Sequence, residues 1–201
     1  MKPVLFSLFV LLAFSSSSAT SKFVLDSEGN ELINGGTYYI LPHIWALGGG
    51  LRLAKTGNET CPLSVVQSPF EVDNGFPWTI RSPLKIRILP LDSNVDFFSV
   101  KGKVPSCVPI PSVWTMVEED GLKSVKIAEY EKAQEGWFRI QQYTSIAYKI
   151  VFCPINGDSC RDLGISRGND GKSLLVITND TPLYVVFIKA ESSDARRASI
   201  M

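Results

Sequence analysis

Val24-Leu-Asp-Ser-Glu-Gly-Asn-Glu-Leu32 is the stretch that decides the fold, together with Tyr38-Tyr39-Ile40 a few residues later. Apolar residues enclose a polar, glycine-containing turn, and an aromatic and aliphatic run follows. Short apolar runs separated by such turns are typical of β-strands joined by tight connections. The stretch therefore indicates a small β-barrel that begins soon after the N-terminus.

The N-terminus has the pattern of a secretory signal peptide. Lys2 precedes an apolar run over Val4–Phe14, and the small residues Ser15–Ala19 follow. The run is roughly half of the ~20 residues that a membrane span needs, so an anchoring helix is the weaker alternative. We expect residues 1–19 to be removed, and the mature protein to be secreted or delivered to a vacuole.

The remaining chain suits one domain. About 180 residues are enough to bury a core without help, and we place the domain at residues 20–190. The polar end, residues 191–201, is expected to be a flexible tail, with a sorting signal or trimmed propeptide as the alternative. Basic and acidic residues balance at 20 each, so the sequence predicts no nucleic-acid or membrane partner, and we expect a monomer.

Short runs rich in β-branched and aromatic residues recur along the whole chain, and no long segment has a helical period. Turn sequences such as Asn34-Gly-Gly36 and Asp73-Asn-Gly75 separate them, which predicts an all-β barrel or sandwich. The expected strands are 37–41, 63–67, 84–89, 97–100, 113–117, 137–143, 147–152, 174–178 and 183–189.

The four cysteines are expected to form disulfides, because the secretory pathway is oxidising; a metal site is the second interpretation. Four cysteines allow three connectivities, of which the simplest is the sequential one. It joins Cys61 to Cys107 and Cys153 to Cys160. The first of these rings would enclose Lys85.

No residue set is typical of an enzyme active site, so we expect neither catalysis nor a cofactor nor a metal. The single histidine, His43, has no nucleophile or orienting acid assigned to it by the sequence. The acidic run Glu118-Glu-Asp120 is interpreted as a solvated loop rather than a metal or acid/base cluster. The segment Gly168-Asn-Asp-Gly-Lys-Ser173 is interpreted as a hairpin turn, although it imitates a phosphate loop.

Two sequons suggest glycosylation on a secreted chain. Asn58 is followed by Glu59 and Thr60, and Asn179 by Asp180 and Thr181. Asn179 is the weaker candidate, because Pro182 follows its threonine.

The segment 82–88 is a candidate binding loop. Pro83 fixes its own φ and favours an extended Ser82, so the chain entering Leu84 and Lys85 is already close to the shape that a protease cleft accepts. A loop ordered before encounter avoids much of the entropic cost of binding. The alternative is an ordinary edge strand with solvated basic residues. The segment reads Ser82-Pro83-Leu84-Lys85-Ile86-Arg87-Ile88.

From Phe23 to about Lys189 the chain resembles the plant Kunitz-type trypsin inhibitor family. The entry motif of that family is matched by Val24, Asp26, Gly29, Leu32, Tyr38 and Ile40. Further likeness lies in the segments 57–66, 136–140, 148–154 and 182–187.

The resemblance implies a β-trefoil of about twelve strands with pseudo-three-fold symmetry, and the sequential disulfide pairing. It implies that Ser82–Ile88 is the reactive loop, with Lys85 before the scissile bond and Ile86 after it, and that Asn34 supports the loop from behind. The expected partner is a trypsin-like serine protease. Relatives of this fold also include storage proteins, partner- or carbohydrate-binding proteins and inhibitors of other protease classes, which remain the alternatives.

Overall fold

The computed structural model describes residues 22–44, 47–108, 110, 112–119, 121–127, 133–157 and 159–190. Regular structure in this part of the chain consists of 13 β-strands, without a helix of a length that could span a membrane. The strands are β1 (Gly36–Pro42), β2 (Leu51–Ala54), β3 (Ser64–Gln67), β4 (Trp78–Arg81), β5 (Asn94–Ser99), β6 (Trp114–Glu119), β7 (Leu122–Ile127), β8 (Ala133–Gln134), β9 (Gly136–Gln142), β10 (Tyr148–Pro154), β11 (Arg161–Arg167), β12 (Ser173–Ile177) and β13 (Tyr184–Lys189).

Six strands close into a barrel. Going round it, antiparallel pairing joins β1 to β4, β4 to β5, β5 to β9, β9 to β10, β10 to β13, and β13 back to β1. Closure leaves these strands without a free edge. The loops that connect them are therefore held at both ends by hydrogen-bonded strands.

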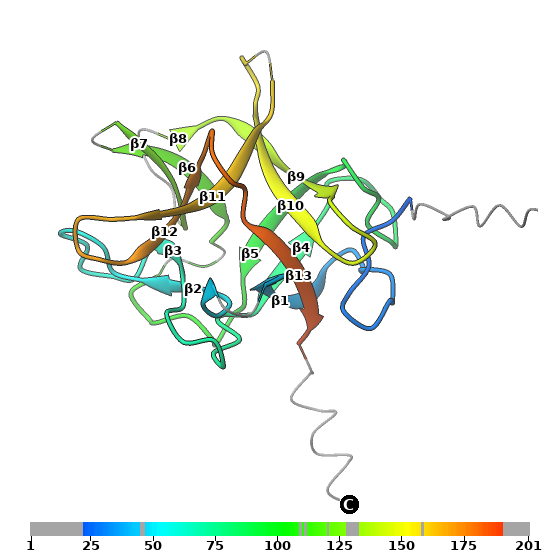
Figure 1. Cartoon of the computed structure of the whole chain (residues 1–201), viewed down its shortest axis with the longest axis horizontal. Helices are drawn as coiled ribbons and strands as arrows, with labels where there is room; N and C mark the ends of the chain where they lie inside the picture. Colours follow the sequence, from blue (N-terminus) through cyan, green and yellow to red (C-terminus); the bar gives the residue numbers. More distant parts are fainter. Residues whose placement is uncertain are drawn as a thin grey trace, which may run out of the picture.

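Three hairpins lie at one end of the barrel: β2–β3, β6–β7 and β11–β12. One strand of each hairpin pairs with the others, since β3, β7 and β12 contact one another in all three combinations. Figure 1 shows the hairpins gathered on one side of the barrel strands.

The chain therefore contains three successive units of barrel strand, hairpin and barrel strand. They are β1–β4, then β5 to β9, then β10–β13, with the short β8 as an addition in the second. This arrangement is the β-trefoil, so the expected fold and its twelve principal strands are confirmed.

Large aromatic side chains fill the barrel. Trp114 packs against Trp78 edge-on at 5.2 Å between ring centroids and stacks on Phe97 at 4.2 Å. Alternate residues along each barrel strand are buried, as in β5 with its pattern of Val95, Phe97 and Ser99 inward. Val95 and Phe97 belong to one continuous core cluster, whose close packing makes the barrel a rigid support for its loops.

The two disulfides join Cys61 to Cys107 and Cys153 to Cys160, which is the sequential pairing, and no cysteine is left free. The first ties the connection before β3 to the connection between β5 and β6. The second closes the short turn between β10 and β11. The predicted signal peptide, 1–19, and tail, 191–201, lie outside the described residues.

Two expectations about local structure are wrong. Residues 84–89 do not form a strand, because no neighbouring strand pairs with residues 82–87 and only Ile88 makes an isolated bridge, to Ile33. Glu118 and Glu119 lie at the end of β6 rather than in a loop, since Lys123 and Leu122 pair with them across the hairpin.

Candidate functional site

The segment Ser82–Arg87 is the connection between β4 and β5, and both of its ends are fixed. Ser82 follows the last residue of β4 and is buried. Beyond the segment, Ile88 bridges to Ile33 and the amide of Leu89 donates to the Leu32 carbonyl at 3.0 Å. The N-terminal segment that carries the family motif thus forms the base on which the loop stands.

The side chain of Asn34 holds the loop from inside. Its Nδ2 donates to the carbonyls of Leu84 and Ile86 at 3.1 and 2.9 Å, and a longer contact of 3.5 Å reaches the Ser82 carbonyl. Its Oδ1 accepts the amide of Ser82 at 2.9 Å. One side chain therefore replaces the strand partner that this segment lacks.

The backbone around Asn34 is fixed, which directs the side-chain amide of Asn34 toward the loop. The N–H of Asn34 donates to the Arg87 carbonyl and the N–H of Gly35 to the Ile80 carbonyl, both at 2.8 Å. Gly35 has a φ of +82°, a conformation that glycine adopts without strain. The turn is held from below by the buried hydroxyl of Tyr38, which accepts the Ile33 amide at 2.9 Å.

A tight turn places Lys85 at the apex of the loop. The amide of Ile86 donates to the Leu84 carbonyl at 2.9 Å, which closes a three-residue turn around Lys85. The hydroxyl of Ser82 accepts the Leu84 amide at 3.3 Å. The side chains of Lys85 and Leu84 are exposed, while Ile86 is half-buried.

The carbonyls along the loop differ in one respect that bears on function. Those of Leu84 and Ile86 are bonded to Asn34, and that of Arg87 accepts the Asn34 amide. Among the hydrogen bonds of the described residues, none is accepted by the carbonyl of Lys85. The carbonyl of Lys85 is therefore available to a partner, whereas the carbonyl of the other basic residue in the loop, Arg87, is already bonded within the protein.

The sequons lie on the surface. Asn58 is exposed in a turn before β3. Asn179 is also exposed, but its Oδ1 accepts a hydrogen bond from Arg161 at 2.8 Å. His43 is half-buried at the end of β1 and takes no part in the loop.

The sequence analysis did not predict one buried cation, the side chain of Lys126. Lys126 of β7 is only 5% exposed, and its ammonium lies 2.8 Å from Glu59 and 2.6 Å from Glu119. Burial opposes the charge, but these hydrogen bonds outweigh it and raise the pKa of Lys126 above its ordinary value. Burial likewise opposes the charge of Glu59, yet the bonds from Lys126 and Ser64 bring the pKa of that carboxyl below its ordinary value.

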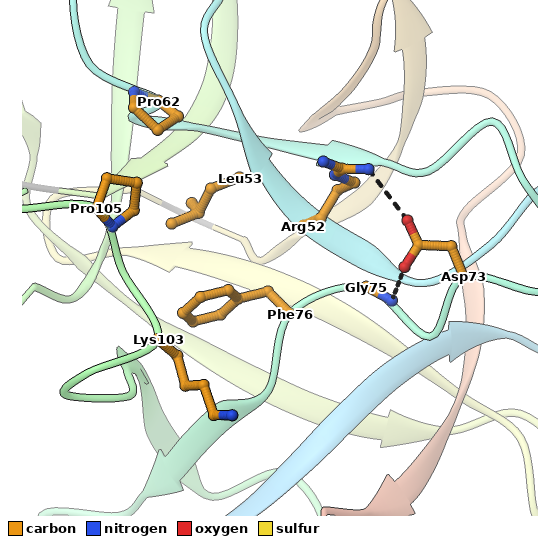
Figure 2. A pocket seen from close by; sticks show the side chains of 8 residues that line it. All are labelled: Arg52, Leu53, Pro62, Asp73, Gly75, Phe76, Lys103 and Pro105. Carbon is orange, nitrogen blue, oxygen red and sulfur yellow. Dashed lines mark hydrogen bonds and ion pairs between the residues drawn. The ribbon is translucent and has the colours of Figure 1, made fainter.

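One pocket of the described residues lies away from the loop. Figure 2 shows it between β2 and the connection before β4, with the Arg52–Asp73 ion pair on one side and the Phe76 ring beside Pro105. In the part of the chain that the structure describes, no group of His, Cys, Asp or Glu side chains is placed to hold a metal. The candidate site is the exposed loop at residues 82–87 rather than this pocket.

Comparisons with known proteins give one consistent result. A family model described as "Trypsin and protease inhibitor" matches residues 24–189. The chain is 46% identical to trypsin inhibitor A of Glycine max over 95% of this chain and 93% of that one, and 45% identical to trypsin inhibitor DE-3 of Erythrina variegata over 85% and 99%. The solved complex of porcine pancreatic trypsin with soybean trypsin inhibitor contains a chain 46% identical, with a TM-score of 0.78 over 84% of this chain and 99% of that chain.

Proposed function

Because the chain belongs to the legume Kunitz family of trypsin and protease inhibitors, we propose that it inhibits trypsin-like serine proteases and that Lys85–Ile86 is the bond offered to them. The protein is not an enzyme. The solved complex of trypsin with a soybean inhibitor supports a protease of this class as the partner. The observation that carries the assignment of the bond is the carbonyl of Lys85, which accepts no hydrogen bond among the described residues and lies between two carbonyls that Asn34 holds.

Recognition depends on the charge of Lys85. In the proposed complex its exposed ammonium enters the specificity pocket, where a buried carboxylate of the protease pairs with it. An uncharged residue at this position would leave that carboxylate unpaired, which costs several kcal/mol. Leu84 and Arg87, both exposed, lie on either side to fill neighbouring subsites.

Slow turnover follows from the support behind the loop. Attack by the protease serine on the Lys85 carbonyl would release the amine of Ile86. Asn34 bonds the carbonyls of Leu84 and Ile86 directly, so the two sides of the cut stay in register and the amine remains beside the acyl group. Re-formation of the peptide then competes with hydrolysis, and the protease remains occupied.

The test is a comparison of Lys85→Ala with Arg87→Ala. We expect Lys85→Ala to raise the inhibition constant for trypsin by at least 1,000-fold, or about 4 kcal/mol, as for a buried interface anchor. Arg87→Ala should change it less than tenfold. Equal losses in both variants would refute Lys85–Ile86 as the bond offered to the protease. Wild-type protein that trypsin simply digests at Lys85 would favour a non-inhibitory trefoil with a storage or binding role.

We also propose that the protein passes through the secretory pathway. The predicted leader and the two disulfides support this, since disulfides persist in oxidising compartments. Mass spectrometry of the mature protein from its tissue would reveal the cleavage site and any glycan. Asn58 is the favoured acceptor, because Pro182 follows the threonine of the Asn179 sequon.

A further inference from the structure

A second loop, Ser68–Gly75, repeats the local design of the Lys85 loop. Each begins with a Ser-Pro pair, and in each the serine hydroxyl accepts the amide two residues later at 3.3 Å: Ser68 from Phe70, and Ser82 from Leu84. The two loops lie before and after the same strand, β4. The likeness is local and involves only the first residues, so the remainder of the loop decides whether it can bind a partner.

Asp73 holds the second loop as Asn34 holds the first. Both of its backbone groups and both carboxylate oxygens are bonded, at distances of 2.7 to 3.1 Å. Figure 2 shows two of these bonds. The partners are the carbonyl of Phe70, the amides of Gly50 and Gly75, and the side chains of Ser68 and Arg52.

The charge of Asp73 keeps this support in place. Burial opposes ionisation, but the hydrogen bonds from Ser68, Gly75 and Arg52 outweigh it and hold the pKa of Asp73 below its ordinary value. The loop is also joined to the β1–β2 connection, where the Gly49 amide donates to the Ser68 carbonyl at 2.8 Å. A side chain at Gly49 would collide with the carbonyl of Phe70, so the two connections fit closely.

Val72 is the residue that this support presents. It is 91% exposed, the highest value among the large exposed hydrophobic residues of the described chain. Its carbonyl accepts no hydrogen bond among the described residues, and the next residue is the fully bonded Asp73. Lys85 has the same combination of exposed side chain and unbonded carbonyl. The support differs in extent: both neighbours of Lys85 are bonded, whereas Val72 lies in a turn that the Asp73 amide closes onto the Phe70 carbonyl.

We propose that Ser68–Gly75 is a second protease-binding loop, in which Val72 enters the small apolar specificity pocket of an elastase-type serine protease. The uncharged side chain of Val72 would gain nothing from the acidic pocket of a trypsin-type protease. It is also short and β-branched, so it would leave the wide pocket of a chymotrypsin-type protease partly empty. The inference goes beyond inhibition of trypsin-like enzymes and does not depend on Lys85.

Binding at this loop is expected to be weaker than at the first. The carbonyl of Phe70 accepts the Asp73 amide, so it cannot also pair with a protease strand. We expect an inhibition constant for elastase at least tenfold higher than that for trypsin. The loops flank the two ends of β4, whose four residues span roughly 13 Å of extended chain, so two proteases can bind together only if they approach from opposite ends of this strand.

The first experiment titrates pancreatic elastase with protein already saturated by trypsin. We expect elastase inhibition to persist and a species with one inhibitor, one trypsin and one elastase to appear in size-exclusion chromatography with light scattering. Val72→Asp should weaken elastase inhibition at least tenfold and leave trypsin inhibition unchanged. Absence of elastase inhibition, its loss when trypsin is bound, or an unaffected Val72→Asp variant overturns the proposal.

The second experiment tests whether the Ser68–Gly75 loop can be redirected from elastase to trypsin. In the Lys85→Ala background, Val72→Lys should restore measurable trypsin inhibition, because the loop now offers a cation. Ile155→Lys in the same background is the matched control, since Ile155 is also an exposed aliphatic residue in a loop, 58% exposed. If trypsin digests the Val72→Lys loop without being inhibited, the support around Asp73 is not sufficient and the proposal is wrong. The elastase titration is independent of Lys85, so it separates this failure from failure of the trypsin loop.

Discussion

Replacement of Asn34 tests the proposed mechanism most directly, because Asn34 supports the loop, whereas Lys85 is the residue that enters the protease. Asn34→Ala removes three well-formed hydrogen bonds, to Ser82, Leu84 and Ile86, and one long contact. At about 1 kcal/mol each the three bonds sum to about 3 kcal/mol, and the half-exposed setting reduces this to about 2 kcal/mol. The loop would have to be ordered on binding, so the inhibition constant for trypsin should rise about 30-fold.

Asn34→Asp should be worse than Asn34→Ala. It places a carboxylate oxygen where an N–H group now faces the carbonyls of Leu84 and Ile86, so repulsion is added to the lost bonds. Both variants should also be cleaved faster at Lys85–Ile86, because the two sides of the cut are no longer held in register.

The assays are slow-binding inhibition of trypsin and mass spectrometry of the inhibitor during incubation. Asn179→Ala is the control, since its side chain makes one exposed hydrogen bond, to Arg161, in another part of the fold. Inhibition constants within twofold of wild type for both Asn34 variants, with no faster cleavage, would falsify the idea that this amide preorganises the loop.

Three further predictions concern stability. Lys126→Met leaves the carboxylate of Glu59 buried without its cation, so the free energy of unfolding should fall by about 3 kcal/mol in urea titrations; a loss below 1 kcal/mol would contradict the assigned role. The pKa of Glu59 is lowered by folding, so the stabilisation that its charge provides is complete above the ordinary value of 4.5 and is lost as the pH falls through the folded pKa. Thermal melts from pH 6 to pH 2 should show this loss of stability, and Glu59→Gln should make it smaller. Replacing both Cys61 and Cys107 by serine should cost about 4 kcal/mol on the chain-entropy model, measured as a lower unfolding midpoint; an unchanged midpoint would argue against a stabilising cross-link.

The sequence predicts five of the six barrel strands, because their side chains alternate between core and surface; the sixth, β4, was not among the expected strands. Runs such as 37–41 and 183–189 lie inside β1 and β13, where β-branched and aromatic residues are buried. The run at 84–89 has the same composition but forms a loop. Composition cannot reveal that β4 already has β1 and β5 as neighbours and that no strand remains to pair with this segment.

The three-fold repeat and the support of the loops could not be predicted from residue patterns. The symmetry lies in the pairing of strands, and the three units fill the core with different side chains, as with Trp78 in one unit and Phe187 in another. Asn34 was expected only through the family resemblance, since it lies 48 residues before Ser82. The role of Lys126 was missed, because its partner Glu59 lies 67 residues earlier and the two meet only in the folded chain; its second partner, Glu119, lies across the β6–β7 hairpin.

The Cys61–Cys107 cross-link gives the molecule a property that goes beyond stability. The segment between the two cysteines includes Lys85 and Ile86, so a single cut between these residues opens a ring and liberates nothing. Both halves stay covalently attached, and the ladder between β4 and β5 keeps the new chain ends as neighbours. A severed copy therefore weighs one water more than an intact one and migrates as a single band until a reducing agent divides it.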